Sequence, residues 1–168
     1  YQALRDNCKT LHEACAKLYT NAKAGNLTNA DVEAACEAFK NARLQWERSE
    51  AFLYGAATDH EIDPHIDSWP LDHDQLVQAL TDANVMSGIK GQGSQYVFTN
   101  NGKFNSVLGF HGLEFVLFRN GAARTAADFA ANDTEAGMTT VAGIDELAFA
   151  DAVSGDIYNM TTLLHYGW

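Results

Sequence analysis

The sequence predicts an all-α protein, a helical bundle of about five helices joined by long loops. Apolar residues recur at intervals of three and four over several long stretches, which is the spacing of one face of an α-helix. Pairs of glycine and asparagine follow some of these stretches, as they do at helix ends. No internal repeat, low-complexity run or heptad array is evident. With 168 residues the chain is long enough for a sizeable core, so we expect residues 1–168 to form one helical bundle domain.

The first two helices are predicted at residues 2–24 and 30–54. The first carries a regular apolar stripe and ends at Gly25, which is followed by asparagine. The second helix follows an N-cap at Thr28 or Asn29. Apolar residues cover more than one face of its second half, so we expect that half to be buried on several sides.

Three cysteines, Cys8, Cys15 and Cys36, fall in these two helices and do not form the Cys-x-x-Cys pattern of a zinc site. If the helices form an antiparallel hairpin, Cys15 lies nearly opposite Cys36. A disulfide between these two residues would indicate an oxidising compartment. The alternative is that all three are small buried hydrophobic residues, and the sequence leaves both interpretations open.

Residues 55–70 break the helical pattern and are predicted to form a long loop. The chain is acidic between residues 59 and 74 and contains three histidines there, His60, His65 and His73. Imidazole and carboxylate groups can bind a metal, but this spacing matches neither a zinc motif nor a calcium-binding loop. We therefore expect a solvated acidic loop that a few apolar side chains hold to the body of the protein.

The rest of the chain is predicted to contain three more helices separated by segments rich in small and polar residues. Loops are assigned where Gly, Ser, Asn and Thr accumulate. The first of these helices is predicted from residue 71 to 85–87, and a loop follows over 88–102. The second is predicted over 103–119. A polar segment over 122–143, with a short helix at 126–131, then leads to the last helix over 144–165.

The net charge of −11 excludes several classes of partner. Without a basic stripe the chain cannot neutralise phosphates, so neither nucleic acid nor an anionic membrane surface is expected as a partner. An acidic surface suits either the attraction of cations or simple solubility. No apolar run is long enough to span a membrane, so we do not expect a transmembrane protein. The chain starts at Tyr1 rather than Met, and we expect a processed or trimmed chain.

Two ionisable residues, His111 and Glu114, lie in the mostly apolar and aromatic run over residues 104–118. Three positions apart on a helix, they share one face and point to one place. An imidazole and a carboxylate on one helical face are a common way to bind a divalent metal in a bundle. Gly109 and Gly112 each weaken a helix by roughly 1 kcal/mol relative to Ala, so this helix is expected to need room for another backbone, a metal or a substrate.

The segment that starts at Gly109, Gly-Phe-His-Gly-Leu-Glu, resembles the Gly-x-His-x-x-Glu signature of the imelysin family. Residues 46–55 resemble the family's helix end rich in Trp and Glu, and residues 66–70 resemble its Ile-Asp-x-Trp-Pro turn. The three motifs occur in the family's order, and the resemblance covers nearly the whole chain. Family members are longer and are built from two helical-bundle halves, so this chain resembles the first half, and the missing second half is expected as a partner.

The resemblance also implies roles for individual residues. His111 and Glu114 match the family's proposed metal-binding or catalytic pair. Glu47 and Glu50 match acidic positions of the family, and they are candidates for third metal ligands or for hydrogen-bond partners of the ligands.

Three further motif residues are expected to act mainly through structure. Gly109 precedes the histidine of the signature, and Asp67 and Trp69 match the turn motif. The family is classed with metallopeptidases and includes iron-regulated proteins of the periplasm and of the outer-membrane or cell surface, so the same localisation is expected here.

Three functions remain open at this point. The first, which we expect, is a protein outside the cytoplasm that binds a divalent metal, iron or zinc, together with an iron-uptake partner protein. The second is a metallopeptidase that acts on a peptide. A zinc hydrolase needs about three protein ligands and a general base, and this helix offers one His and one Glu. The third is a helical binding module in which His111 and Glu114 form a hydrogen-bonded pair without metal.

Overall fold

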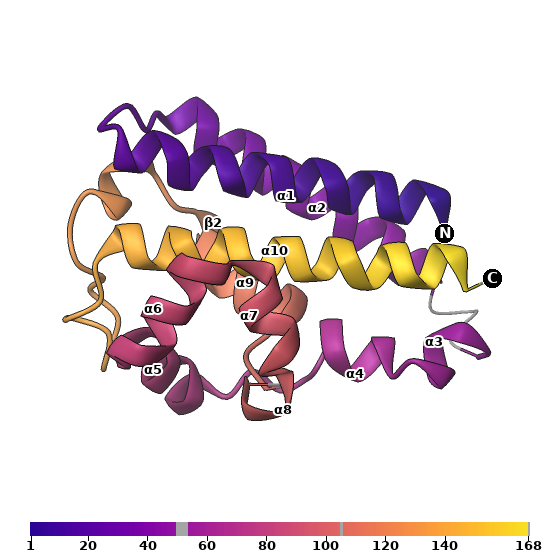
Figure 1. Cartoon of the computed structure of the whole chain (residues 1–168). Coiled ribbons are helices and arrows are strands. Elements are labelled where there is room, and N and C mark those ends of the chain that lie inside the picture. Colours follow the sequence, from indigo (N-terminus) through magenta and orange to yellow (C-terminus); the bar gives the residue numbers. More distant parts are fainter. Residues whose placement is uncertain (50–53, 105, 168) are drawn as a thin grey trace.

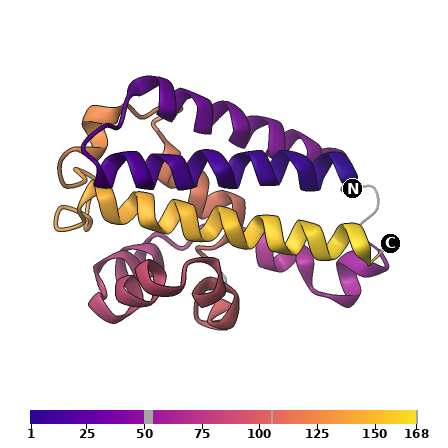
Figure 2. The same ribbon diagram turned by 45° about the horizontal axis from the view of Figure 1, so that its top comes forward.

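Three long helices, α1 (Gln2–Lys23), α2 (Asn29–Ser49) and α10 (Gly143–Tyr166), run side by side through the protein. The computed structural model describes residues 1–49, 54–104 and 106–167, and these residues contain ten α-helices. Helix α1 runs antiparallel to both α2 and α10, and both ends of the chain lie at the same end of the bundle (Figures 1 and 2). The predicted all-α bundle is therefore confirmed.

The first two helices form where the sequence predicts them. The stripe of α1 is buried at Leu4, Cys8, Leu11, Cys15 and Leu18. Before α2, the backbone N–H of Thr28 donates to the Asp31 carboxylate over 3.1 Å, and the backbone N–H of Asp31 donates to the Thr28 hydroxyl over 3.3 Å. This reciprocal capping satisfies N–H groups that no helical carbonyl can reach. Of the predicted end of α2, residues 50–53 lie outside the described residues, and Tyr54 lies outside the helix.

Helix α10 is the centre of the fold. It packs against α1, α9, α7, α6, α4 and the 3-10 helix η2 (Ala126–Phe129). Its predicted stripe is buried, and so are residues on its other faces, including Ala148, Phe149 and Ala152. A helix that is buried on several faces lies in the middle of a bundle. Among the described residues, no helix combines the length and the apolar character that crossing a membrane would require.

The described part of the chain also forms seven shorter helices, which lie mainly along one side of α10 (Figure 1). In chain order they are α3 (Ala56–Asp59), α4 (Ile62–Ile66), α5 (His73–Thr81), α6 (Ala83–Gln92), α7 (Ser94–Thr99), α8 (Asn101–Phe104) and α9 (Gly109–Leu117).

The predicted loop over residues 55–70 is wrong, because α3 and α4 lie within it. The side chains of Ile62 and Ile66 are fully buried and fix α4 to the core. Pro64 lies in the first turn of α4, where its missing N–H costs no helical hydrogen bond. The acidic segment is therefore only partly solvated.

The predicted loop over residues 88–102 is also wrong. The helix before it is broken at Asp82, whose side chain accepts hydrogen bonds from the backbone of Asn84 over 2.7 Å and starts α6. Helix α6 then continues to Gln92. Gly88 is required by packing rather than by a turn, because a Cβ there would overlap the ring of Tyr96.

The predicted helix over residues 103–119 is too long at both ends. Helix α9 begins at Gly109, and Phe118–Arg119 forms strand β1, which pairs antiparallel with strand β2 at Ala122–Ala123. The turn between the strands has positive φ at both Asn120 and Gly121, as a two-residue hairpin turn of type I′ requires. The asparagine and glycine therefore mark a hairpin and not a helix end.

The three cysteines are free and buried, so the possible Cys15–Cys36 disulfide is absent. Cys36 instead donates a weak hydrogen bond from Sγ to the carbonyl oxygen of Leu117 over 3.7 Å. The alternative, three small buried hydrophobic residues, is the one that the structure contains.

Candidate metal site around His111

Helix α9 packs against the end of α4 backbone to backbone, and this contact positions His111. Gly109 has a φ of +71°, and a Cβ on it would overlap the carbonyl oxygen of Ile66, the last residue of α4. A Cβ on Gly112 would likewise overlap the carbonyl oxygen of Val107. Both positions are therefore glycine because another segment of backbone lies where a Cβ would be. The contact brings His111 next to the residue that follows α4.

That residue, Asp67, contacts three other side chains of the site. Trp46 Nε1 donates a hydrogen bond to Asp67 Oδ2 over 2.7 Å, and His111 Nε2 lies 3.0 Å from Asp67 Oδ1. Arg43 forms an ion pair with the same Oδ1. Burial alone would raise the pKa of the Asp67 carboxyl, but the three donors outweigh burial and hold this pKa below its ordinary value. Asp67 is therefore an ionised, almost fully enclosed carboxylate.

The other nitrogen of His111 faces Glu114. His111 Nδ1 lies 3.7 Å from Glu114 Oε2, so the predicted pair does meet on one face of α9. The His111 side chain is 16% exposed and that of Glu114 is 55% exposed. The Trp69 ring packs against the His111 ring with 4.7 Å between centroids, although Trp69 is itself largely exposed. The pair is thus reachable from solvent on the Glu114 side.

A pocket of about 380 Å³ opens beside this pair. Four of its nine lining residues carry aromatic rings, and Glu114 and Arg119 add charge. It is lined by Trp69, Leu71, His111, Glu114, Phe115, Phe118, Arg119, Asn120 and Gly121. A concave site with aromatic walls and a few convergent polar groups is typical of a ligand-binding pocket.

The acidic positions at the end of α2 are placed differently. Glu47 Oε1 lies 2.5 Å from Arg43 Nη2, and Arg43 in turn binds Asp67. Glu47 therefore reaches the site through Arg43 and does not contact His111. Glu50 lies outside the described residues.

The donor set fits a divalent metal in part. Imidazole nitrogen and carboxylate oxygen suit iron, zinc and manganese alike. Residues 1–49, 54–104 and 106–167 contain no group of three or more His, Cys, Asp or Glu side chains arranged to hold a metal ion. His111 and Glu114 are thus two ligands, and a complete shell requires others.

The three histidines of the acidic segment do not gather into a second site. His65 is buried, with its Nε2 2.6 Å from Asp156 Oδ2 and its Nδ1 2.8 Å from Asn101 Nδ2. The ring of His73 packs edge-on against Phe115 with 5.6 Å between centroids. His60 is exposed at the end of α3.

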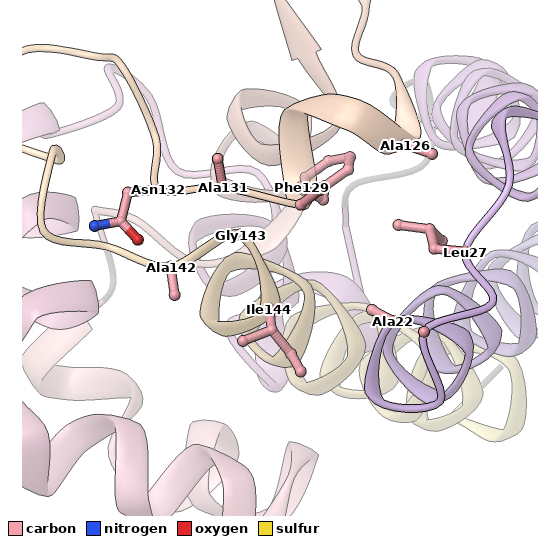
Figure 3. Close-up of a pocket in the computed structure, with 11 residues that line it drawn as sticks. Ala22, Leu27, Ala126, Phe129, Ala131, Asn132, Ala142, Gly143 and Ile144 are labelled. Carbon is pink, nitrogen blue, oxygen red and sulfur yellow. The ribbon is translucent and has the colours of Figure 1, made fainter.

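Another pocket, of about 390 Å³, lies where the turn after α1 meets the start of α10 (Figure 3). Its lining residues are Ala22, Gly25, Leu27, Ala126, Phe129, Ala130, Ala131, Asn132, Ala142, Gly143 and Ile144. None of these side chains can titrate, and Asn132 alone is polar. The pocket beside His111 is therefore the better candidate for chemistry.

The sequence patterns did not single out Arg43, and they included Trp46 only as part of a motif, so they did not predict that these two residues of α2 hold Asp67. A signal was present, because the two are three positions apart and so share one face of α2. Arg43 is also one of only 11 basic residues in an acidic chain.

Comparisons with known proteins agree with the fold and with the resemblance to the imelysin family. The family profile described as imelysin, peptidase M75, matches residues 1–168. The chain is similar to iron-regulated protein A of Synechococcus elongatus, with 33% identity over 91 residues, which are 54% of this chain and 21% of that protein. It is also similar to the crystal structure of a protein assigned as an iron-regulated protein A precursor from Parabacteroides distasonis. That match has a TM-score of 0.74 and 27% identity over 100% of this chain and 40% of the other. The chain thus spans less than half the length of these relatives, and its match to the family profile from end to end shows that it belongs to the imelysin family.

Proposed function

We propose that this protein binds a divalent metal ion, iron or zinc, through His111 and Glu114, and that it serves iron uptake outside the cytoplasm. The observation that carries the proposal is the 3.7 Å approach of His111 Nδ1 to Glu114 Oε2 beside an open pocket. Two groups bound to one metal at about 2.1 Å lie roughly 3.3 Å apart, so a small adjustment suffices. The net charge of −11 also favours cations.

The remaining ligands are proposed to come from outside this pair. Three sources of further ligands are available: water, Glu50, and the second half of a longer protein. The last is included because both matched relatives are longer than this chain. In this proposal residues 1–168 form one helical bundle domain of such a protein. The name iron-regulated protein A, carried by both relatives, supports a role in iron metabolism. We propose the periplasm or the cell surface as the place of this role.

Elemental analysis tests the proposal directly. The protein is purified without added metal, soaked with iron or zinc, desalted and analysed as wild type, His111→Ala, Glu114→Gln and His60→Ala. We expect one metal ion per wild-type chain, loss of that metal in the first two variants, and retention in His60→Ala, which removes an exposed imidazole elsewhere. Absence of metal from the wild type, or its retention in His111→Ala, would refute the site.

A metallopeptidase is the second candidate, and the exposure of Glu114 favours it. A carboxylate that is 55% exposed beside a metal ligand is able to act as a general base for a bound water. In that case His111 and Glu114 are catalytic, and hydrolysis of a casein or peptide substrate is stopped by a chelator and lost in Glu114→Gln. Metal binding without any hydrolysis would leave the first candidate alone.

A further inference from the structure

The two ring nitrogens of His111 face two different carboxylates at two different distances. Nε2 lies 3.0 Å from Asp67 Oδ1, which is the length of a hydrogen bond. Nδ1 lies 3.7 Å from Glu114 Oε2, which is too long for one. A neutral imidazole carries one proton on one of the two nitrogens, so these distances bear on which nitrogen carries it.

Asp67 is able only to accept. Its Oδ2 receives the indole N–H of Trp46, and its Oδ1 receives the guanidinium of Arg43, so two fixed donors hold the carboxylate in its ionised form. The Asp67 side chain is 9% exposed, and little water competes for these oxygens. Whatever lies 3.0 Å from Oδ1 must therefore offer a hydrogen. A bare lone pair on Nε2 would instead be repelled by the carboxylate.

We infer that Asp67, held by Arg43 and Trp46, is a positioning residue that fixes His111 as the Nε2–H tautomer and so leaves Nδ1 as the donor atom beside Glu114. The assignment of the tautomer depends only on the contacts of Asp67. The use of Nδ1 as a metal ligand rests on the proposed function. The family motif alone does not say which nitrogen binds.

Two further contacts hold the ring in this orientation. Gly109 docks α9 on Ile66, the residue directly before Asp67, so the spacing between imidazole and carboxylate is set by backbone contact. Trp69 lies two residues after Asp67 and packs on the imidazole at 4.7 Å between ring centroids. Asp67 therefore acts from a short rigid segment, as a partner that orients a metal ligand should.

The tautomer is measured by two-bond ¹H–¹⁵N correlation NMR on metal-free protein labelled with ¹⁵N-histidine, at a pH where His111 is neutral. We expect the wild type to show a protonated Nε2 and an unprotonated Nδ1 for His111, assigned by the loss of these signals in His111→Ala. Asp67→Ala should give the mixed signals of an unconstrained imidazole. Asp59→Asn, which changes an exposed carboxylate at the end of α3, should leave the wild-type pattern.

Titration with Zn²⁺ tests the consequence for metal binding. We expect the wild-type Nδ1 signal to shift on adding Zn²⁺ while Nε2 keeps its proton, and Asp67→Ala to weaken the affinity by about 10- to 100-fold. An Nδ1–H tautomer in the metal-free wild type would overturn the inference, whether or not Asp67→Ala folds. An Nε2–H tautomer in a protein that fails to bind Zn²⁺ would refute the proposed metal function and support the positioning role of Asp67.

Discussion

Arg124 and Glu146 form a two-point ion pair in the interior of the protein. Arg124 Nη1 lies 2.7 Å from Glu146 Oε1 and Nη2 lies 2.9 Å from Oε2, with Glu146 fully buried and the Arg124 side chain 5% exposed. Arg119, which lines the candidate pocket, joins the pair at 3.4 Å from Glu146 and is 2.6 Å from Asp133. These contacts connect the β1–β2 hairpin to the first turn of α10, and they hold Arg119 in place in the pocket wall.

Arg124→Ala should therefore destabilise the fold strongly. The change leaves the buried Glu146 carboxylate without its main partner, and breaking a buried pair in this way costs about 3–5 kcal/mol of unfolding free energy. Urea denaturation followed by circular dichroism measures this quantity. Lys9→Ala is the control, because it removes an exposed pair with Glu13 on α1 and should leave the unfolding free energy almost unchanged. A loss below about 1 kcal/mol in Arg124→Ala would contradict the importance of the buried pair.

Gly109→Ala should separate α9 from α4 and lower stability by at least about 2 kcal/mol, since it combines a left-handed backbone with a steric overlap on Ile66. Gly91→Ala provides the matched control. That glycine is in α6 with no neighbour near its Cβ position, so alanine should be neutral or stabilise the protein by up to about 1 kcal/mol. Equal unfolding free energies for the two variants would show that the close approach to Ile66 is not required.

The long helices could be predicted from the sequence because each carries its own apolar period. Helix α10, for instance, is buried at every position of the predicted stripe from Leu147 to Leu164. The short helices could not be predicted in the same way, because packing and not periodicity decides them. Several Gly, Ser and Asn residues make the segment 88–102 look like a loop, yet Gly88 is glycine because the Tyr96 ring lies against it.

The candidate site could be predicted in part for a similar reason. His111 and Glu114 are three residues apart, and helical geometry alone brings them together. The contact of Asp67 with His111 joins residues 44 positions apart, and it depends on how α4 docks on α9. No local sequence pattern predicts this contact. The resemblance to the family directed attention to Asp67, but as a structural residue of a turn.

Asp67→Asn should reduce stability in a manner that depends on pH. The pKa of Asp67 is lower in the folded protein than in the unfolded chain, where it is about 3.9. Its carboxylate therefore stabilises the fold above about pH 4, and this contribution disappears as the pH falls through the lower folded-state value. We expect a difference in unfolding free energy of about 1–3 kcal/mol between wild type and variant at pH 7, shrinking towards pH 3.

Urea denaturation at pH 7, 5 and 3 measures this difference. Asp59→Asn is the control, because Asp59 is an exposed residue of α3 and its replacement should change little at any of these pH values. A difference for Asp67→Asn that is as large at pH 3 as at pH 7 would mean that the charge of Asp67 contributes nothing to the fold.

The buried cysteines lead to a prediction about thiol reactivity. Burial raises the pKa of Cys8 and Cys15 to about 12 and that of Cys36 to about 11, so almost no thiolate forms at pH 8. An aromatic disulfide reagent should therefore label the native protein only slowly, at the rate of its unfolding. In denaturant without reductant, the same reagent should label all 3 cysteines. Labelling of a single cysteine, with an intact mass lower by two hydrogens, would instead demonstrate a disulfide between two of the three.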